Sequence, residues 1–481
     1  MAPSPTGHFH IGSARTALYN YLMARQTGGQ FILRIEDTDL KRNTSEALDE
    51  LIEAMHWLGL TWDEGPDIGG PHAPYIQTAR KQVYLEHARQ LIEGGHAYYC
   101  FCTQARSKEL RAAQMAAKLP LRYDGRCRAI PPAEAAARAA AEPHTIRFKT
   151  PEDGVTTVHD ELRGDISVEN RNIDDFILIK SDGYAVYHLA AMVDDHLMGI
   201  THVFRGSEWL STFPLHGLII RAFGWEEPKW VHLSVFLKPT GKGKMSKRDV
   251  TSEQSIFVLG LRDLGYLPEA VNNWIALMGA SFGAEETLLS LEEMIERFSL
   301  EHLTPSAARV NFEKLDHFNG LYLRRLTADD LAARVRPFLE QAGLNPDDDT
   351  LRRVAPLIRE RIVTLDDAVE MAGFFFRRAP KPAADISVKG LTPEQSRAAL
   401  EQALDLLTKM PAGGFTHEVL EPPLRALAEQ LGVKPGQLFG LLRVAVTGQS
   451  VSPPLFESMA IIGREQCLAR VASAIEQMRA G

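Results

Sequence analysis

Ala2-Pro3-Ser4-Pro5-Thr6-Gly7-His8-Phe9-His10-Ile11-Gly12-Ser13, close to the amino terminus, is the stretch that decides the fold. Prolines and glycines make its first half a turn, and Ser13 is a suitable N-cap for a helix that continues until Gly28. The first backbone N–H groups of a helix have no acceptor within the helix. We therefore expect this helix start to offer free N–H groups to phosphate oxygens.

A second stretch, Lys244-Met245-Ser246-Lys247-Arg248, complements the first. Its cations can neutralise phosphate charge, although lysines on a glycine-rich loop are common. Gly241 and Gly243 precede it and would allow the loop to close over a bound nucleotide. The two stretches together predict an ATP site whose chemistry releases pyrophosphate.

The segments after the turn predict a parallel α/β sheet. The run Phe31–Ile35 indicates a buried strand, and Thr44 is a suitable cap for the helix that follows it. Ligands of such sheets gather at the carboxyl ends of the strands. Glu36, Asp37 and Asp39 lie at this end and are candidate ligand-binding residues.

The first strand of this sheet is the unusual feature. A Rossmann-type sheet needs a strand that leads into the phosphate-binding turn, but here the chain begins at the turn itself. We expect either that the start codon has been assigned too late or that the protein lacks a central strand and one substrate ligand. The first alternative is favoured.

The composition is that of an ordinary globular protein. Hydrophobic residues make up 45% and charged residues 24% of a chain of 481 residues, which is long enough for several domains. No apolar run approaches the roughly 20 residues that span a bilayer, and no signal peptide precedes the first motif. Four cysteines do not suggest a disulfide scaffold. We expect a cytoplasmic protein with no membrane partner.

The formal net charge of -9 excludes a protein that binds nucleic acid through general basicity. If RNA is the partner, the basic groups must be local. The candidates are the segment Lys238–Arg248 and the cluster Arg352, Arg353, Arg359 and Arg361. The alternative is that both are solvated faces.

The two motifs resemble those of class I aminoacyl-tRNA synthetases. His10-Ile11-Gly12-Ser13 is similar to the HIGH motif, and Lys244–Arg248 matches the KMSKS motif at its first four positions. Within this class the chain resembles the bacterial glutamyl-tRNA synthetases nearly from end to end. The stretches that carry this resemblance are Pro3-Ser4-Pro5-Thr6-Gly7, Arg34-Ile35-Glu36-Asp37-Thr38-Asp39, Tyr187-His188-Leu189-Ala190 and Leu442-Arg443-Val444-Ala445-Val446-Thr447-Gly448.

The resemblance implies an α/β Rossmann-like catalytic domain with an α+β insertion, followed by an all-α carboxyl-terminal half with helical anticodon-binding domains. The expected domains are 1–96 with 181–250 (catalytic), 97–180 (insertion that binds the acceptor end), 251–325 (linking), and 326–379 and 380–481 (anticodon-binding). Ile177–Lys180 and Tyr184–Leu189 have strand-like patterns, and Pro132–Glu142 is expected to be a surface helix.

The activity that the resemblance implies is that of a glutamate–tRNA ligase. ATP would activate L-glutamate to glutamyl-adenylate, and the glutamyl group would pass to the 3′-terminal adenosine of glutamate tRNA. The triphosphate charge implies Mg²⁺, for which no carboxylate ligand can be named. The family is usually monomeric. The alternatives are a non-discriminating form that also charges glutamine tRNA, and a catalytically silent tRNA-binding protein.

The resemblance also assigns roles to individual residues. The catalytic residues would be His10, Lys244 and Lys247. ATP would contact Thr6, His10, Gly12, Phe236, Lys244, Ser246 and Lys247. Glutamate would contact Ala2, Ser4, Glu36, Tyr187, Arg205 and Glu208. Arg205 would make a bidentate carboxylate contact, or alternatively a surface salt bridge with Glu208. Either Arg359 or Arg361 would bond to an anticodon base.

Cys100, Cys102 and Cys127 resemble a zinc site of some bacterial members of the family. A histidine two residues after the third cysteine completes that site, but an alanine occupies the position here. Because structural zinc is almost always four-coordinate, three thiolates make a poor closed site. His96 or His144 could replace the missing ligand. Neither histidine has the expected spacing, so we favour the alternative of a set of reduced thiols without metal.

Overall fold

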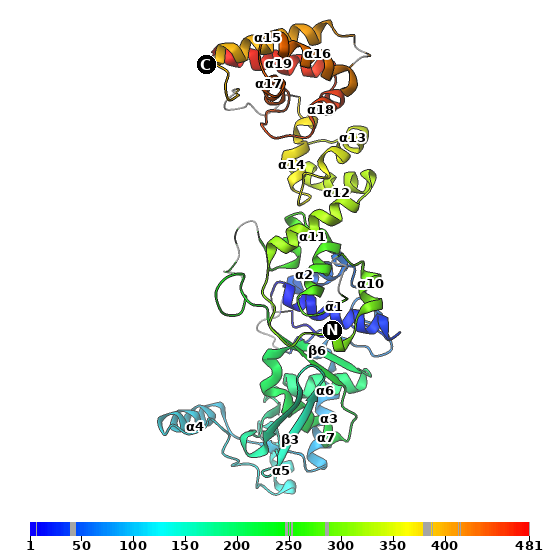
Figure 1. The fold of residues 1–481 in the computed structure, drawn as a ribbon. Helices are drawn as coiled ribbons and strands as arrows, with labels where there is room; N and C mark the ends of the chain where they lie inside the picture. The colour runs from blue at the N-terminus through cyan, green and yellow to red at the C-terminus, as the bar shows by residue number, and fades with distance from the viewer. Residues whose placement is uncertain are drawn as a thin grey trace. The chain divides into compact units, whose positions relative to one another are not determined.

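The structure is a computed structural model that describes residues 1–5, 7–38, 45–245, 249, 251, 254–283, 288–378, 386, 388–411, 413 and 415–480. The chain divides into two compact units, residues 1–260 with 271–312 and residues 261–270 with 313–481. Figure 1 labels their helices and strands. Strands occur only before residue 234 in the described part of the chain, so the predicted order of an α/β part and a helical part is confirmed.

Residues 1–3 lie parallel to residues 32–36 in the first unit. The Met1 nitrogen donates to the Ile32 carbonyl oxygen at 2.8 Å, and the Arg34 N–H donates back to the Met1 carbonyl oxygen at 2.9 Å. The Glu36 N–H continues the series to the Pro3 carbonyl oxygen at 3.0 Å. This alternation is the hydrogen-bond pattern of parallel strands. Extended backbone therefore does precede the phosphate-binding turn in the sheet.

Parallel pairing continues on the other segments of this unit. The predicted strand Phe31–Ile35 forms parallel bridges with Glu64 and Ile76. β6 (His202–Gly206) pairs in parallel with β7 (Lys229–Leu233). These pairings are those of the Rossmann-like arrangement that the sequence predicted.

Helix α1 (Ile11–Gln26) is buried around most of its circumference. Ala14, Ala17, Leu18 and Tyr19 are fully buried, and Arg15 is almost as well enclosed. A helix that is buried on most sides belongs to the interior of a domain, so its first turn is held rigidly.

Outside the insertion, the described chain before residue 312 forms further helices. They are α2 (Ser45–Trp57), η1 (Gln77–Arg80), α3 (Lys81–Glu93), α6 (Tyr187–Leu197), η3 (Ser207–Thr212), α7 (Phe213–Phe223), α8 (Val258–Asp263), α9 (Pro268–Leu277), α10 (Leu291–Arg297) and η4 (Leu300–His302). The predicted cap Thr44 of the second helix lies outside the described residues.

The predicted strand-like segment Tyr184–Leu189 is wrong, because Tyr187 begins helix α6. Only Ala185 forms a bridge, with Ile179. An alternating pattern over six residues does not distinguish a strand from the first turn of a buried helix. The seven residues from Leu189 to Asp195 are all buried, as expected for a helix enclosed on every side.

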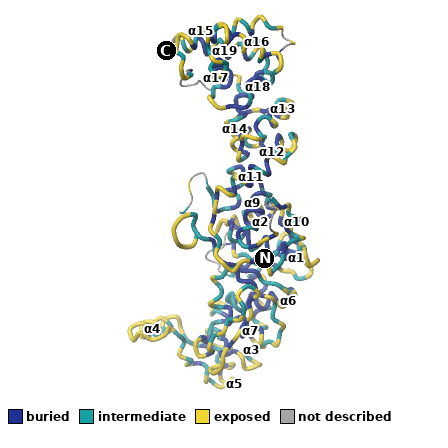
Figure 2. The backbone as a smooth tube through the Cα atoms, viewed as in Figure 1, coloured by how far each residue is buried: buried dark blue, intermediate teal, exposed yellow. Residues whose placement is uncertain are grey.

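The insertion contains two small antiparallel sheets and two helices. The sheets are β1–β2–β5 (Ala97–Cys100, Thr145–Phe148, Ile177–Ile179) and the hairpin β3–β4 (Val155–Asp160, Gly164–Glu169). A short η2 (Asn170–Asn172) follows the hairpin, and α5 (Pro132–Ala139) confirms the predicted surface helix. α4 (Gln104–Ala116) has no buried residue and projects as an arm from this region (Figures 1 and 2).

The second unit is helical throughout its described residues. After α11 (Phe312–Arg325) come α12 (Ala328–Gln341), α13 (Asp348–Ile358), α14 (Asp367–Ala372), η5 (Gly373–Phe376), α15 (Pro393–Lys409), α16 (His417–Gln430), α17 (Pro435–Thr447), α18 (Leu455–Ile462) and α19 (Arg464–Ala480). Leu400, Leu424, Leu442 and Met459 are fully buried in one core that the last five helices share. Within the described residues, no helix has the length and hydropathy of a membrane span.

Candidate active site

A cavity of about 570 Å³ lies beside the first turn of α1 and the residues that follow β6 and β7. Every predicted ATP- or glutamate-contacting residue that the structure describes lines it, namely Ala2, Ser4, His10, Gly12, Glu36, Tyr187, Arg205, Glu208, Phe236 and Lys244. The other predicted contacts, Thr6, Ser246 and Lys247, lie outside the described residues. The cavity occupies the carboxyl edge of the strands, where α/β sheets bind ligands.

His10 is the N-cap of α1, in place of the predicted Ser13. Its Nδ1 accepts the backbone N–H groups of Gly12 at 3.1 Å and Ser13 at 3.2 Å. The Ile11 N–H donates to the Ile256 carbonyl oxygen at 2.8 Å. The prediction that the first N–H groups of the helix are free for phosphate is therefore wrong, because a side chain and a neighbouring backbone segment already accept them.

The other nitrogen of His10 remains available. Because Nδ1 accepts, a neutral ring carries its hydrogen on Nε2, and Ser13 Oγ lies 3.4 Å from that atom. Burial of the ring, together with the charge of Lys244, lowers the pKa of His10. The neutral imidazole thus offers one N–H donor at the wall of the cavity.

The basic loop begins as a tight hairpin. The Met245 N–H donates to the Phe236 carbonyl oxygen at 2.8 Å, and the Lys238 N–H donates to the Gly243 carbonyl oxygen at 3.1 Å. Gly243, at φ +114°, and Gly241, at φ +77°, have backbone conformations that favour glycine. The two glycines therefore form the turn that places Lys244 at the cavity.

Arg309 holds this hairpin from outside the motif. Its Nη1 donates to the carbonyl oxygens of Lys238 at 2.6 Å, Pro239 at 3.4 Å and Gly241 at 3.0 Å. Nothing in the local sequence pattern suggested this contact, because about sixty residues separate the arginine from the loop.

Phe236 is fixed by an arginine of α1. The Arg15 guanidinium carbon lies 4.1 Å from the centroid of the Phe236 ring. Arg15 Nη1 donates to the Met278 carbonyl oxygen at 3.1 Å, and Nη2 donates to that of Ser234. The aromatic wall of the cavity is thus held by a buried cation whose Nη1 and Nη2 are bonded to backbone.

Glu36 lies in a buried network of opposite charges. Its Oε1 accepts from Arg34 Nη2 at 3.2 Å, and Arg34 Nη1 donates to Asp195 Oδ1 at 2.9 Å. Burial raises the pKa of Glu36 to about 7, against the opposing effect of the Arg34 charge. Its carboxyl group therefore changes protonation state near neutral pH.

Arg205 is buried, with 7% of its surface exposed. It bonds to His232, His216 and Tyr187. Among the described residues it makes no ion pair with Glu208, so the alternative of a surface salt bridge between them is wrong. Its Nη2 is buried without a hydrogen-bond partner and is the donor left for a ligand.

Two family matches cover most of the chain. The family of "tRNA synthetases class I (E and Q), catalytic domain" matches residues 1–317, and the "Anticodon binding domain" matches residues 330–475. A glutamate–tRNA ligase of Roseiflexus castenholzii is 45% identical over 499 residues, which cover 100% of this chain and 96% of that protein.

The chain belongs to the glutamate–tRNA ligase family. A second member, from Thermus thermophilus, is 42% identical over 483 residues, with 99% of both chains covered. The crystal structure of a glutamate tRNA ligase from Elizabethkingia meningosepticum, in complex with its amino acid, has a TM-score of 0.89 at 35% identity. It covers 99% of this chain and 98% of that one.

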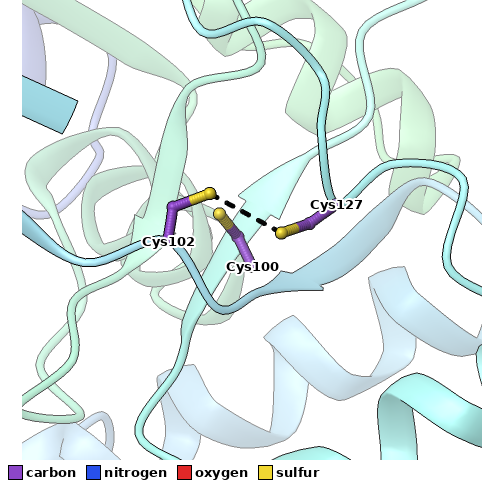
Figure 3. A group of neighbouring side chains, drawn as sticks. All are labelled: Cys100, Cys102 and Cys127. Atoms are coloured by element: carbon purple, nitrogen blue, oxygen red, sulfur yellow. Dashed lines mark hydrogen bonds between the residues drawn. The ribbon is translucent and has the colours of Figure 1, made fainter. Parts of the chain in front are cut away.

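The glutamate–tRNA ligase fold of this chain also contains the predicted cysteine cluster, with the three sulfur atoms within 4.8 Å of one another (Figure 3). Cys102 Sγ and Cys127 Sγ are 3.7 Å apart. Among the described residues, the group that could hold a metal ion consists of the three cysteines, and it includes neither His96 nor His144. The Tyr123 hydroxyl lies instead 3.4 Å from Cys100 Sγ and 3.5 Å from Cys102 Sγ.

Tyr123 was missed by sequence reasoning, although it lies four residues before Cys127 in the same loop. The Cys127 N–H also donates to its hydroxyl at 2.9 Å. The Tyr123 hydroxyl, and not a histidine, therefore lies beside the thiols.

The arginines of the predicted basic cluster in the second unit differ in their hydrogen bonds and ion pairs. Arg352 is paired with Asp329 at 2.5 Å, and Arg359 Nη1 donates to the Leu326 carbonyl oxygen at 3.3 Å. Arg361 is exposed, and its side chain has no hydrogen bond or ion pair with any described residue. The local structure thus leaves Arg361 the more accessible of the two predicted anticodon contacts.

Proposed function

We propose that this protein is a glutamate–tRNA ligase that activates L-glutamate with ATP and transfers it to glutamate tRNA. The observation that carries this proposal is that the motif residues His10 and Lys244 share one cavity with a buried acid, Glu36, and a buried cation, Arg205. One end of the cavity suits phosphate, and the other suits an amino acid with an acidic side chain.

The ATP end rests on His10, Lys244 and Phe236. The α-carboxylate of glutamate attacks the α-phosphorus of ATP, the bond to the β-phosphate breaks, and pyrophosphate leaves. Negative charge gathers on phosphate oxygens in the transition state. We assign the His10 Nε2–H to the α-phosphate and Lys244, with Lys247, to the β- and γ-phosphates. Mg²⁺ would share the neutralisation of the triphosphate. The aromatic side chain of Phe236 supplies an apolar wall for the adenosine.

The amino-acid end rests on Glu36 and Arg205. An ionised Glu36 would pair with the substrate ammonium group, and Ala2 and Ser4 lie on the same wall of the cavity. Arg205 Nη2 would donate to the side-chain carboxylate. A bidentate contact would also need Nη1, whose remaining hydrogen meets Tyr187 Oη at 3.3 Å, so Tyr187 would have to turn away.

The second step needs little from the protein. The terminal ribose hydroxyl of tRNA attacks the acyl carbon of the adenylate, and AMP leaves. Because AMP is a good leaving group, we assign no general base. The tRNA would contact the insertion and the helical second unit, with Arg361 as the proposed anticodon contact. The five domains expected from the sequence, a cytoplasmic location and a monomeric state complete the proposal.

A zinc ion is a second component of the proposal. Thiolate sulfur lies about 2.3 Å from zinc, so two thiolates of a tetrahedral site are separated by somewhat less than 4 Å. The 3.7 Å between Cys102 Sγ and Cys127 Sγ fits that spacing. Cys100 and the hydroxyl of Tyr123 would complete four ligands. Zinc would hold the loop around Cys127 against strand β1, away from the catalytic cavity.

Charging of purified glutamate tRNA and, separately, glutamine tRNA with labelled glutamate tests the function. Charging of the first alone supports a discriminating ligase, and charging of both supports a non-discriminating one. A silent binder would retain tRNA on a filter but give no tRNA-dependent pyrophosphate exchange. That last result, from folded protein, would refute the proposed activity.

A further inference from the structure

The Arg205 guanidinium is held on its protein side by two buried histidines. Arg205 Nε donates to His232 Nε2 at 2.8 Å, and Arg205 Nη1 donates to His216 Nδ1 at 2.9 Å. Both histidines are fully buried. The flat face of the guanidinium lies over Trp230, with its central carbon 4.6 Å from the ring centroid.

These contacts fix the tautomers of both histidines. A guanidinium only donates, so the ring nitrogens that face Arg205 carry no hydrogen. His232 therefore carries its hydrogen on Nδ1, which donates to Asp160 Oδ2 at 2.7 Å. His216 carries its hydrogen on Nε2, which donates to His188 Nδ1 at 2.9 Å. Each acceptor is thus locked by a second bond on its far side.

The same contacts leave one nitrogen of Arg205 free. Nε and Nη1 are bonded to histidines, and Nη1 also meets Tyr187 Oη at 3.3 Å. Nη2 is buried and has no partner among the described residues. An unpaired buried donor of a charged group is costly, so its persistence indicates that a ligand supplies the acceptor.

The chemical nature of the two acceptors determines what that ligand should be. Burial and the Arg205 charge lower the pKa of His216 well below its ordinary value, and burial also lowers that of His232 despite its bond to Asp160. Both rings are therefore neutral. Within the described chain, Arg205 makes no direct ion pair, and carboxylates act on it only at longer range, through Asp160 behind His232 and through Asp195. An anionic ligand gains the full charge interaction, whereas a carboxamide gains only a hydrogen bond.

We propose that His216 and His232 position the Arg205 guanidinium and thereby set the preference of the site for a carboxylate over a carboxamide side chain. The inference rests on the proposed function, in which Arg205 binds the side-chain carboxylate of the amino acid. The competing explanation is that the two histidines merely fill space in the core beneath the cavity.

Matched amide substitutions separate the two explanations. An asparagine places its carbonyl oxygen near the position of Nδ1, and a glutamine places it near Nε2. H216N and H232Q therefore keep an acceptor facing Arg205, whereas H216Q and H232N move it away. The exposed His159 of β3 supplies a control, H159N. Each variant is melted by circular dichroism, and kcat/KM is measured for glutamate and for glutamine in tRNA-dependent pyrophosphate exchange.

We expect the preference for glutamate over glutamine to stay within about threefold of the parent in H216N and H232Q. It should fall about ten- to a hundredfold in H216Q and H232N, as expected for the loss of a hydrogen bond to a charged group. The KM for ATP should stay constant throughout, because the histidines lie behind the amino-acid end of the cavity.

The inference is overturned if the two amides at each position behave alike, or if all four variants fail to fold while H159N folds. If the histidines only filled space, asparagine would not be the better replacement at position 216 and glutamine the better one at position 232. A parent protein that charges no glutamate at all refutes the proposed function instead. The two failures are therefore distinguishable.

Discussion

The imidazole of His10 occupies the space that a side chain on Gly12 would need. A Cβ on Gly12 would lie 3.0 Å from both Cε1 and Nδ1 of His10, which is closer than such contacts normally are. A larger residue at position 12 would therefore press on the imidazole that caps the helix. Histidine and glycine form one unit, in which the ring caps the helix with one nitrogen and presents the other to the cavity.

Replacing His10 by asparagine should separate its two roles. Asparagine is a good N-cap, so we expect the unfolding free energy to change by no more than about 0.5 kcal/mol. The Nε2–H donor is lost, so tRNA-dependent pyrophosphate exchange should slow about a hundredfold. H10A should lose the rate and about 1 kcal/mol of stability as well. Unchanged exchange in H10N would contradict the proposed phosphate contact.

The affinity for glutamate should depend on pH through Glu36. Its pKa is raised to about 7 by burial, and only the ionised carboxylate pairs with the substrate ammonium group. The KM for glutamate should therefore rise as the pH falls through this value. E36Q should raise KM and abolish the pH dependence. Steady-state kinetics at a series of pH values tests this, and an unchanged pH profile in E36Q would exclude Glu36 as the titrating group.

Zinc should co-purify with the protein at about one equivalent per chain if the tetrahedral site forms. C127S should lose the metal, and Y123F, which removes the proposed fourth ligand, should bind it at least about tenfold more weakly. C467A is the matched control, because Cys467 lies alone in the second unit. Metal analysis after dialysis gives the answer. Protein that is free of metal after growth with added zinc would support the reduced-thiol alternative.

Removing the hydrogen bonds of Arg309 to the hairpin of the basic loop should weaken ATP binding. R309Q loses the donors to three carbonyl oxygens of residues 238–241, so the hairpin that carries Lys244 becomes less ordered. We expect the KM for ATP to rise about tenfold and the KM for glutamate to stay constant. R89Q, an exposed arginine on α3, is the control. An equal KM for ATP in R309Q and R89Q would show that the Arg309 hydrogen bonds have no role in nucleotide binding.

Arg361 should matter more than Arg359 for tRNA recognition. A side-chain contact to a base is typically worth about 1–3 kcal/mol, so R361A should raise the KM for tRNA about tenfold. The KM for ATP should not change. R359A should lower the melting temperature instead, because its guanidinium bonds to the Leu326 carbonyl oxygen. If R359A instead raised the KM for tRNA and R361A lowered only the melting temperature, Arg359 would be the residue that contacts the anticodon.

The sequence predicted the parts of the site that depend on local pattern. The motif stretches around His10 and Lys244 predicted an ATP site, and Glu36 was a candidate ligand-binding residue because it follows a parallel strand. The resemblance to the synthetases assigned all three to one site. The helix cap was assigned to Ser13, since serine is the commoner capping residue and a histidine cap has no propensity signal.

Contacts between distant segments could not be predicted in this way. His216 and His232 bond to Arg205 from two separate elements, Asp160 bonds to His232 from a third, and no sequence spacing links them. Tyr123 differs, because it lies four residues before Cys127 in the same loop, so its place beside the thiols could have been considered from the sequence. It was overlooked because the expected ligands were histidines.

The projecting helix α4 has a consequence for the unfolding of the molecule. It spans 13 residues and buries none of them, and its start is held by the Thr103 side chain, which accepts from the Arg106 N–H at 3.2 Å. Isolated helices of about 12–15 residues are marginal in water. Melting of α4 would expose little apolar surface, so it should add almost nothing to the heat capacity of unfolding. Calorimetry would therefore not detect its melting, whereas amide hydrogen exchange would show this arm opening before any other long helix.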